Sequence, residues 1–106
     1  MNNCNCGVYL IRNEKNGKVY VGSSREIENR WNRHKLRLRR GTHGNEHLSG
    51  AWNKYGEDSF SFSILEVVDN PEELFLVEQR YIDKFDSMNR KHGYNKTKAQ
   101  PGLFFS

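Results

Sequence analysis

Two β-rich segments on either side of Asn16-Gly17 constrain the fold more than any other feature of the chain. Residues 7–13 read GVYLIRN and residues 18–24 read KVYVGSS, and both are rich in Val, Ile and Tyr, which favour strands. Asn-Gly is the strongest short hairpin motif, because both central residues of a type I′ turn need a positive φ. We therefore expect an antiparallel hairpin with Asn16 and Gly17 as its turn.

The register of this hairpin separates two kinds of side chain. If Lys15 pairs with Lys18, alternation along the strands places Tyr9 and Tyr20 on the same face of the sheet. The other face is then aliphatic and typical of a core. It carries Val8, Leu10, Val19 and Val21.

The remaining chain predicts three helices and one further strand. The first helix follows Ser24, a potential cap, and stops at Gly41, and the last follows Asn70-Pro71. The order β-β-α-α-β-α predicts an α+β fold with a small three-stranded antiparallel or mixed sheet flanked by helices. The expected ranges are about 25–40, 47–55 and 72–85 for the helices and 60–68 for the strand, with a short extended piece at Tyr94-Asn95.

The charge distribution favours an anionic partner. The chain carries a formal net charge of +4, and residues 1–53 hold ten Lys/Arg against four Glu, which nets +6. Residues 54–106 hold seven Lys/Arg against nine Asp/Glu, which nets −2. This asymmetry indicates one surface for phosphates and a separate place for carboxylates.

The cysteines and the hydropathy pattern exclude several classes. Cys4 and Cys6 have no second pair with which to complete a zinc site, so we expect free thiols in a reducing cytosol, although His34 and His43 could in principle be recruited. No apolar run approaches the roughly 20 residues of a membrane span, and there is no secretory pattern. We expect a cytoplasmic protein with no membrane partner.

Polar residues within apolar stripes are the candidate functional groups. His34 shares the apolar stripe of the first helix with Trp31, and Glu78 shares that of the last helix with Leu74. A carboxylate on an apolar face must be paired, hydrogen-bonded or metal-bound. Ordinary explanations stay open at this point: a salt bridge for Glu78, a satisfied core histidine for His34, and simple packing for the two tyrosines.

These residues combine into a pattern that resembles the GIY-YIG nucleases. Gly7-Val8-Tyr9 and Tyr20-Val21-Gly22, with ten residues between the tyrosines, resemble the family signature with Val in place of Ile in both triplets. By this resemblance, Arg30 in EIENRWNRH matches the catalytic arginine and Glu78 in LVEQRYID matches the metal-binding glutamate. The resemblance also matches His34 to a histidine of the site and Gly93-Tyr94-Asn95 to a closing motif, and it covers about residues 7–95.

The resemblance implies a fold unit and an activity. The domain is expected over residues 7–96, with residues 1–6 as a tail and 97–106 as a second tail or the start of a linker. The basic first helix, His43 and the segment WNKYGEDSFSFSILE are most similar to the phage and intron homing endonuclease branch. Alternatives are a restriction or repair nuclease of the same family, and a catalytically silent nucleic-acid-binding module.

The expected activity is metal-dependent hydrolysis of double-stranded DNA in a bacterial or phage-infected cell. With one carboxylate indicated, a single Mg²⁺ or Mn²⁺ on Glu78 fits better than two metals. One active site cuts one strand, so the protein acts as a monomer or a transient dimer on DNA. The chain stops about ten residues after Asn95, so we expect either an excised catalytic domain or a free-standing nuclease of low specificity.

Each candidate residue has an expected role. Tyr9 is the general base or relays a proton from the attacking water, although a phenol titrates near ~10, and Tyr20 holds the phosphate or a water. Arg30 grips the scissile phosphate through its forked donors. His34 positions or protonates, and His43 assists at the rim. The expected catalytic set is Tyr9, Tyr20, Arg30, His34, His43, Glu78 and Asn95, and the DNA-contacting set is Gly22, Arg25, Arg33, Arg37 and Arg40.

Overall fold

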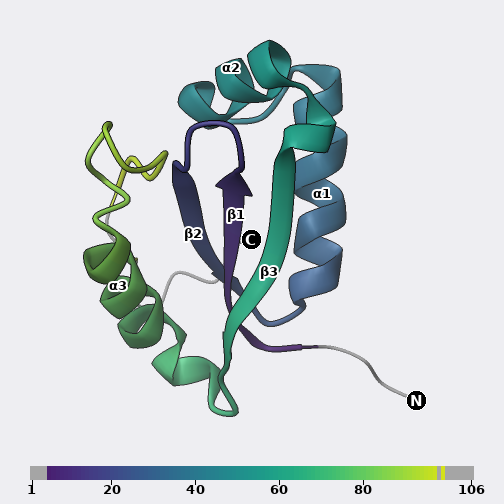
Figure 1. Ribbon diagram of the computed structural model, residues 1–106. Helices are drawn as coiled ribbons and strands as arrows, with labels where there is room; N and C mark the ends of the chain where they lie inside the picture. Colours follow the sequence, from purple (N-terminus) through teal and green to yellow (C-terminus); the bar gives the residue numbers. More distant parts are fainter. Residues whose placement is uncertain (1–4, 98, 100–106) are drawn as a thin grey trace.

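A computed structural model of the chain describes residues 5–97 and 99 and shows a three-stranded antiparallel sheet flanked by helices (Figure 1). The strand order is β2-β1-β3, so β1 is the central strand. The predicted α+β class and the order β-β-α-α-β-α are confirmed. The elements are β1 (Gly7–Asn13), β2 (Val19–Ser24), α1 (Ile27–Arg40), α2 (Glu46–Tyr55), β3 (Phe60–Val67) and α3 (Leu74–Phe85), with short 3₁₀ turns at Glu57–Ser59 and Pro71–Glu73.

The hairpin between β1 and β2 has a longer loop than the sequence predicted. Ile11 pairs with Tyr20, which differs by two residues from the register of a two-residue Asn16-Gly17 turn. The loop has four residues and is closed by the Asn13 N–H, which donates to the Lys18 carbonyl at 2.9 Å. The predicted type I′ turn was therefore wrong.

Asparagine side chains account for the longer loop. The Asn13 side chain accepts from the Lys15 N–H at 2.9 Å, and the Asn16 side chain accepts from the Lys18 N–H at 2.9 Å. These are Asx turns, which compete with a tight type I′ turn. Of the two predicted turn residues, only Gly17 has a positive φ, of 79°. Because the shift is two residues, it leaves every side chain on its predicted face.

Both faces of the sheet are buried. The Val8 face packs under α3 and the Tyr9 face packs under α1 and α2, so the sheet lies between two helical layers (Figure 1). The aliphatic face was predicted to be a core, whereas the second core, around Tyr9 and Ile11, was not. Each fully buried large apolar side chain contributes about 1.5–3 kcal/mol. The second core includes Ile27, Leu38, Leu48 and Trp52, and the first includes Leu10, Val21, Val77 and Ile82.

Helix ends follow local capping chemistry. α1 begins at Ile27, two residues later than predicted, because the Ser24 hydroxyl accepts from the Glu26 N–H at 2.9 Å and ends the extended strand first. Gly41 ends α1 in the left-handed region, at φ 75°, as predicted. The start predicted near residue 72 is instead the 3₁₀ turn Pro71–Glu73, and α3 begins at Leu74.

Two irregular features lie beside the tyrosines. The register between β1 and β3 shifts between Val8 and Tyr9, which marks a β-bulge in β3 and explains the change from alternating to apolar residues along this strand. The predicted extended piece near Tyr94 is present as a parallel bridge between Val19 and Gly93. The chain after α3 therefore returns along the outer edge of β2.

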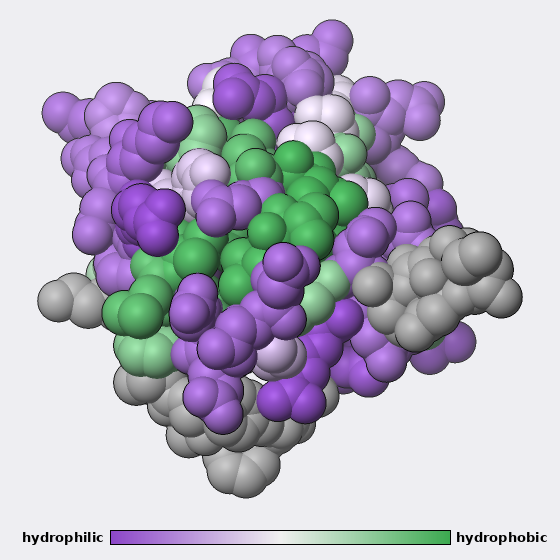
Figure 2. All heavy atoms as spheres, turned by 90° about the horizontal axis from the view of Figure 1, so that it is seen from below, coloured by the Kyte–Doolittle hydropathy of each residue, from purple (hydrophilic) through white to green (hydrophobic). Residues whose placement is uncertain are grey.

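The described part of the chain contains no helix long and apolar enough to cross a membrane. Exposed apolar side chains include Ile64 and Val67 on β3 and Leu76 on α3, of which the last two are 57% exposed. The face seen in Figure 2 gathers apolar residues at its centre, within a hydrophilic surround. Cys4, most of the predicted C-terminal tail and the other residues at both ends lie outside the described residues.

Candidate active site

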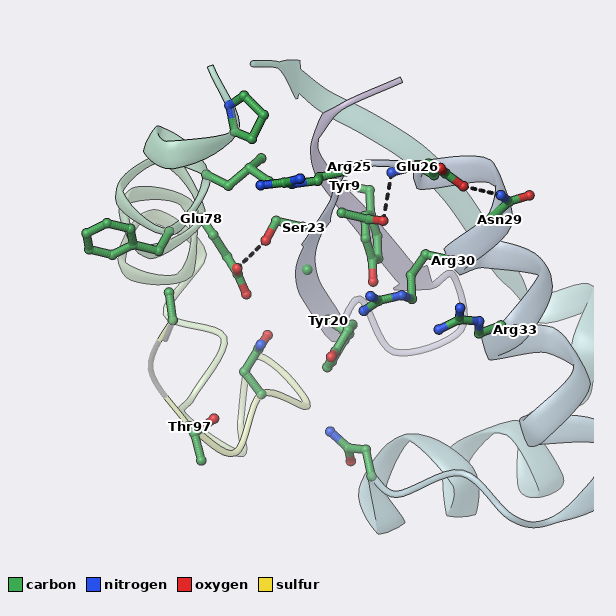
Figure 3. A pocket seen from close by; sticks show the side chains of 18 of the residues that line it. Tyr9, Tyr20, Ser23, Arg25, Glu26, Asn29, Arg30, Arg33, Glu78 and Thr97 are labelled. Atoms are coloured by element: carbon green, nitrogen blue, oxygen red, sulfur yellow. Dashed lines mark hydrogen bonds between the residues drawn. The ribbon is translucent and has the colours of Figure 1, made fainter. Parts of the chain in front are cut away.

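A cavity of about 650 Å³ lies where β2 passes between α1 and α3. Figure 3 shows Glu78 reaching into it from α3, Arg30 and Arg33 from α1, and Tyr20 from β2. Tyr9 also lines this cavity. The structure therefore brings together Tyr9 and Glu78, which are 69 positions apart in the sequence.

A second hollow, of about 480 Å³, adjoins the first and shares Tyr20, Arg30 and Arg33 with it. Both predicted histidines, His34 and His43, line this second hollow. The structure thus divides the predicted site into a carboxylate side and a histidine side, with Tyr20 and Arg30 between them. Of the predicted DNA-contacting arginines, Arg25 lines the first hollow, Arg33 both, Arg37 the second and Arg40 neither.

Tyr9 is the most deeply buried of the predicted catalytic residues. It is 1% exposed, and its hydroxyl lies 2.7 Å from His34 Nε2. Burial raises the pKa of Tyr9 well above its usual value, the charge of Tyr20 adds to the rise, and the Arg30 guanidinium opposes it. Tyr9 is therefore a neutral phenol in the free protein at neutral pH.

Gly22 makes room for Tyr9. A Cβ at this position would lie 2.5 Å from both Cζ and Oη of Tyr9. Gly22 was predicted as a DNA contact through which the backbone could approach closely. The structure gives a different reason for the glycine, since the space that its missing side chain leaves is filled by the tyrosine.

Glu78 is held by a residue that the sequence reasoning missed. The Ser23 hydroxyl donates to Glu78 Oε1 at 2.5 Å (Figure 3). Burial raises the pKa of the Glu78 carboxyl, whereas the Ser23 hydrogen bond and the positive charge of Arg30 oppose that rise. Ser23 follows the second signature triplet directly, and its place on the α3 side of β2 could have indicated its role.

The carboxylate fits a single hard cation rather than a closed metal cage. Residues 5–97 and 99 contain no group of three or more His, Cys, Asp or Glu side chains that could hold a metal ion. A half-buried carboxylate beside an open cavity suits Mg²⁺, which keeps much of its water shell and takes few protein ligands. The predicted metal ligand, Glu78, is thus compatible with an ion completed by water and phosphate oxygens.

The two histidines form a stacked, hydrogen-bonded pair. Their rings lie 5.0 Å apart at 26°, and His34 Nδ1 is 2.7 Å from His43 Nε2. Burial, then the charges of His43, Arg30 and Arg37, lowers the pKa of His34 to about 3. Burial and the charge of Arg37 also lower the pKa of His43. Both rings are therefore neutral at pH 7.

Asn45 and Asn95 each hold a neighbouring part of the site in place. The Asn45 N–H donates to His43 Nδ1 at 3.0 Å, a contact that the sequence did not reveal. The Asn95 side chain accepts from the Val21 N–H at 2.8 Å and donates to the Val21 carbonyl at 2.9 Å. Asn95 lines the first cavity, and this double contact makes it a clamp on β2.

A comparison with known families identifies the fold. Residues 5–95 match the family model of the GIY-YIG catalytic domain. The chain belongs to the GIY-YIG family. The two signature triplets lie in β1 and β2, and they include the site residues Tyr9 and Tyr20.

Solved structures agree with this assignment. The chain is similar to a mutant of the catalytic domain of intron endonuclease I-TevI, with 35% identity and a TM-score of 0.83 over 92% of this chain and 99% of that one. A second structure, the catalytic domain of homing endonuclease I-TevI, matches with 35% identity and a TM-score of 0.78 over 87% of this chain and 98% of that one. The predicted resemblance to the phage and intron branch is confirmed.

Curated relatives of this GIY-YIG chain are longer proteins. Intron-associated endonuclease 1 of Enterobacteria phage T4 is 38% identical over 91% of this chain, and putative MSV199 domain-containing protein 146R of Invertebrate iridescent virus 6 is 32% identical over 81% of it. The aligned part spans only 38% and 36% of these two relatives.

Proposed function

We propose that this chain is the catalytic domain of a DNA endonuclease that hydrolyses phosphodiester bonds with the help of one divalent ion. The observation that carries the proposal is the single cavity in which the Tyr9 and Tyr20 phenols, the Arg30 guanidinium and the Glu78 carboxylate meet. Its membership of the GIY-YIG family and its likeness to catalytic domains of intron endonucleases support the same activity.

The cavity provides the groups that hydrolysis of a phosphodiester needs. Arg30 is placed to bind the scissile phosphate with its forked donors, for which a lysine is not equivalent. Tyr9 carries a proton to or from the attacking water, and Tyr20 orients the phosphate or that water through its hydroxyl. His34, which lines the second hollow, holds the Tyr9 hydroxyl.

Glu78 is the proposed ligand of the divalent ion, Mg²⁺ or Mn²⁺. When bound there, the ion would neutralise charge on the phosphate and assist the leaving oxygen. Ser23 keeps Glu78 Oε1 at a fixed place in the cavity wall, which reduces the cost of ordering the carboxylate for its ligand.

The basic side of the site is proposed to follow the DNA backbone. Arg25, Arg33 and Arg37 surround the two hollows, and Arg40 continues the same charge beyond them on α1. Contacts of this kind bind phosphates and position the duplex without reading its sequence. Double-stranded DNA is therefore the proposed substrate of the domain.

One active site of this size serves one phosphodiester at a time. We therefore propose that each visit cuts one strand, and that a double-strand break needs two visits or transient dimerisation on DNA. Residues 7–96 are the proposed catalytic unit, acting inside a bacterial or phage-infected cell as the T4 relative suggests.

A plasmid assay tests the proposal. Purified protein with Mg²⁺ should convert supercoiled plasmid to the nicked form, and excess EDTA should stop the conversion. A control variant, Glu28→Gln, removes one exposed carboxylate of α1 outside the cavity lining. It should cut like the wild-type protein. DNA binding without any nicking in Mg²⁺ or Mn²⁺ would instead identify a silent nucleic-acid-binding module.

A further inference from the structure

A continuous hydrogen-bonded chain links the loop before α2 to Tyr9. It begins at the Asn45 N–H, which lies 3.0 Å from His43 Nδ1. His43 Nε2 lies 2.7 Å from His34 Nδ1, which carries the chain across to α1. His34 Nε2 then lies 2.7 Å from the Tyr9 hydroxyl, on β1. Each nitrogen of both imidazoles thus has one partner in the chain.

The first member of this chain fixes its direction. A backbone N–H only donates, so His43 Nδ1 must accept and carries no proton. A neutral imidazole has one protonated nitrogen, so the proton of His43 lies on Nε2 and is donated to His34 Nδ1. By the same rule, the proton of His34 lies on Nε2 and is donated to the Tyr9 oxygen.

The surroundings of the pair keep both rings neutral. Burial and the facing charges of Arg30 and Arg37 lower the pKa of His34, and burial and Arg37 lower that of His43. Two further titratable groups, the Tyr9 and Tyr20 phenols, have their rings in contact with the His34 ring. Protonating His43 would also place a second N–H at Nδ1, directly against the Asn45 N–H.

We propose that His43 is a positioning residue: held by the Asn45 amide, it keeps His34 as a hydrogen-bond donor to Tyr9, so that the Tyr9 hydroxyl proton faces the cavity. The opposite direction would make His34 Nε2 an acceptor for that proton. It would require a proton on His43 Nδ1, where the Asn45 N–H already points.

This inference deepens the proposed function, on which its catalytic meaning rests. Because His34 Nε2 already carries a proton, it cannot take the proton of Tyr9. The phenolic proton leaves only on the cavity side, to a water molecule, and the phenolate that remains keeps the His34 Nε2–H as a donor. The positive charge of Arg30 stabilises the same phenolate. Tyr9 is therefore arranged to exchange its proton with the substrate side and not with the histidines.

Imidazole nitrogen spectroscopy on the intact 106-residue chain tests the direction. Long-range proton–nitrogen correlations of the ¹⁵N-labelled protein at neutral pH distinguish the two neutral tautomers. Both His34 and His43 should carry their proton on Nε2 alone. A proton on Nδ1 of either ring would overturn the proposal, and this measurement needs no variant that could fail to fold.

A variant separates positioning from packing. His43→Phe keeps a ring to stack on His34 but removes the donor to its Nδ1, so His34 should gain the Nδ1–H tautomer. The control is His47→Phe on the exposed face of α2, which should leave His34 on Nε2. An unchanged His34 tautomer in His43→Phe, or the same shift in both variants, would overturn the proposal.

The readout is independent of cleavage. A protein that shows these tautomers but never cuts DNA would contradict the proposed function and leave the direction of the chain intact. A protein that cuts DNA with His34 protonated on Nδ1 would do the reverse.

Discussion

Gly22 shows how one residue without a side chain sets the position of another. A Cβ atom added to Gly22 would lie only 2.5 Å from the Tyr9 hydroxyl oxygen. We predict that Gly22→Ala displaces the Tyr9 side chain and lowers the cleavage rate on the order of 100-fold, as expected for a misplaced reacting group. Single-turnover cleavage measures the rate, and DNA binding should change little. Full activity in Gly22→Ala would show that Tyr9 needs no fixed position.

Glu78 makes a prediction about stability. Its pKa is raised in the folded chain, so the folded state binds this proton more tightly than the unfolded state does. The free energy of unfolding therefore falls as the pH rises from the ordinary glutamate pKa through the raised value. At pH 7, Glu78→Gln should have a urea midpoint equal to or higher than wild type, and below the ordinary pKa the difference should vanish. A lower midpoint at pH 7 would show that the carboxylate stabilises the fold.

Some residues of the site could be predicted from the sequence and others could not. Tyr9, Tyr20 and Glu78 could be predicted because strand alternation and an interrupted apolar stripe mark them. The Ser23 contact with Glu78 could not, because it depends on how α3 packs against β2. The contact of the Asn45 backbone N–H with His43 could not be predicted either, because a backbone donor is not specified by residue type.

At the scale of elements, the segment Gly93–Asn95 acts as a clamp on β2, to which it is joined by hydrogen bonds. The Asn95 amide makes two hydrogen bonds to the Val21 backbone. Asn95→Ala should therefore lower the free energy of unfolding by about 1–3 kcal/mol, the sum of two buried hydrogen bonds. Urea unfolding measures this loss, and the neighbouring exposed Lys96→Ala is the control. Equal urea midpoints for the two variants would mean that the clamp contributes nothing to the free energy of unfolding.

The hairpin and β3 show why register is harder to predict than face. The Asn13 and Asn16 side chains both bind their own backbone, and this chemistry replaced the expected two-residue turn with a longer loop. The bulge opposite Tyr9 was also beyond the sequence, because it depends on which residues of β1 and β3 meet. A two-residue shift keeps the face of each side chain, so the prediction that Tyr9 and Tyr20 share one face of the sheet was correct although their predicted strand partners were not.

At the scale of the whole molecule, the basic half of the chain lies beside the cavities. Neutralising phosphates releases counterions, so the logarithm of the DNA affinity should fall linearly with the logarithm of the salt concentration. Arg33→Gln and Arg37→Gln should each reduce that slope by about one. Arg39→Gln is the control, because Arg39 pairs with Glu57 and lines neither hollow. Unchanged slopes for Arg33→Gln and Arg37→Gln would move the DNA path to another surface.

The central claim is that the cavity between α1 and α3 hydrolyses DNA through Glu78. Its most direct measurement is single-turnover cleavage of a defined duplex in Mg²⁺ by wild type, Glu78→Gln and Glu73→Gln, with DNA affinity measured in parallel. Glu73 precedes α3 and is exposed outside the cavity lining, so its variant loses the same charge. We predict a loss of about 100-fold or more for Glu78→Gln alone, since charge stabilisation at a reacting group is worth that much, with DNA binding retained. Wild-type cleavage by Glu78→Gln would contradict the account.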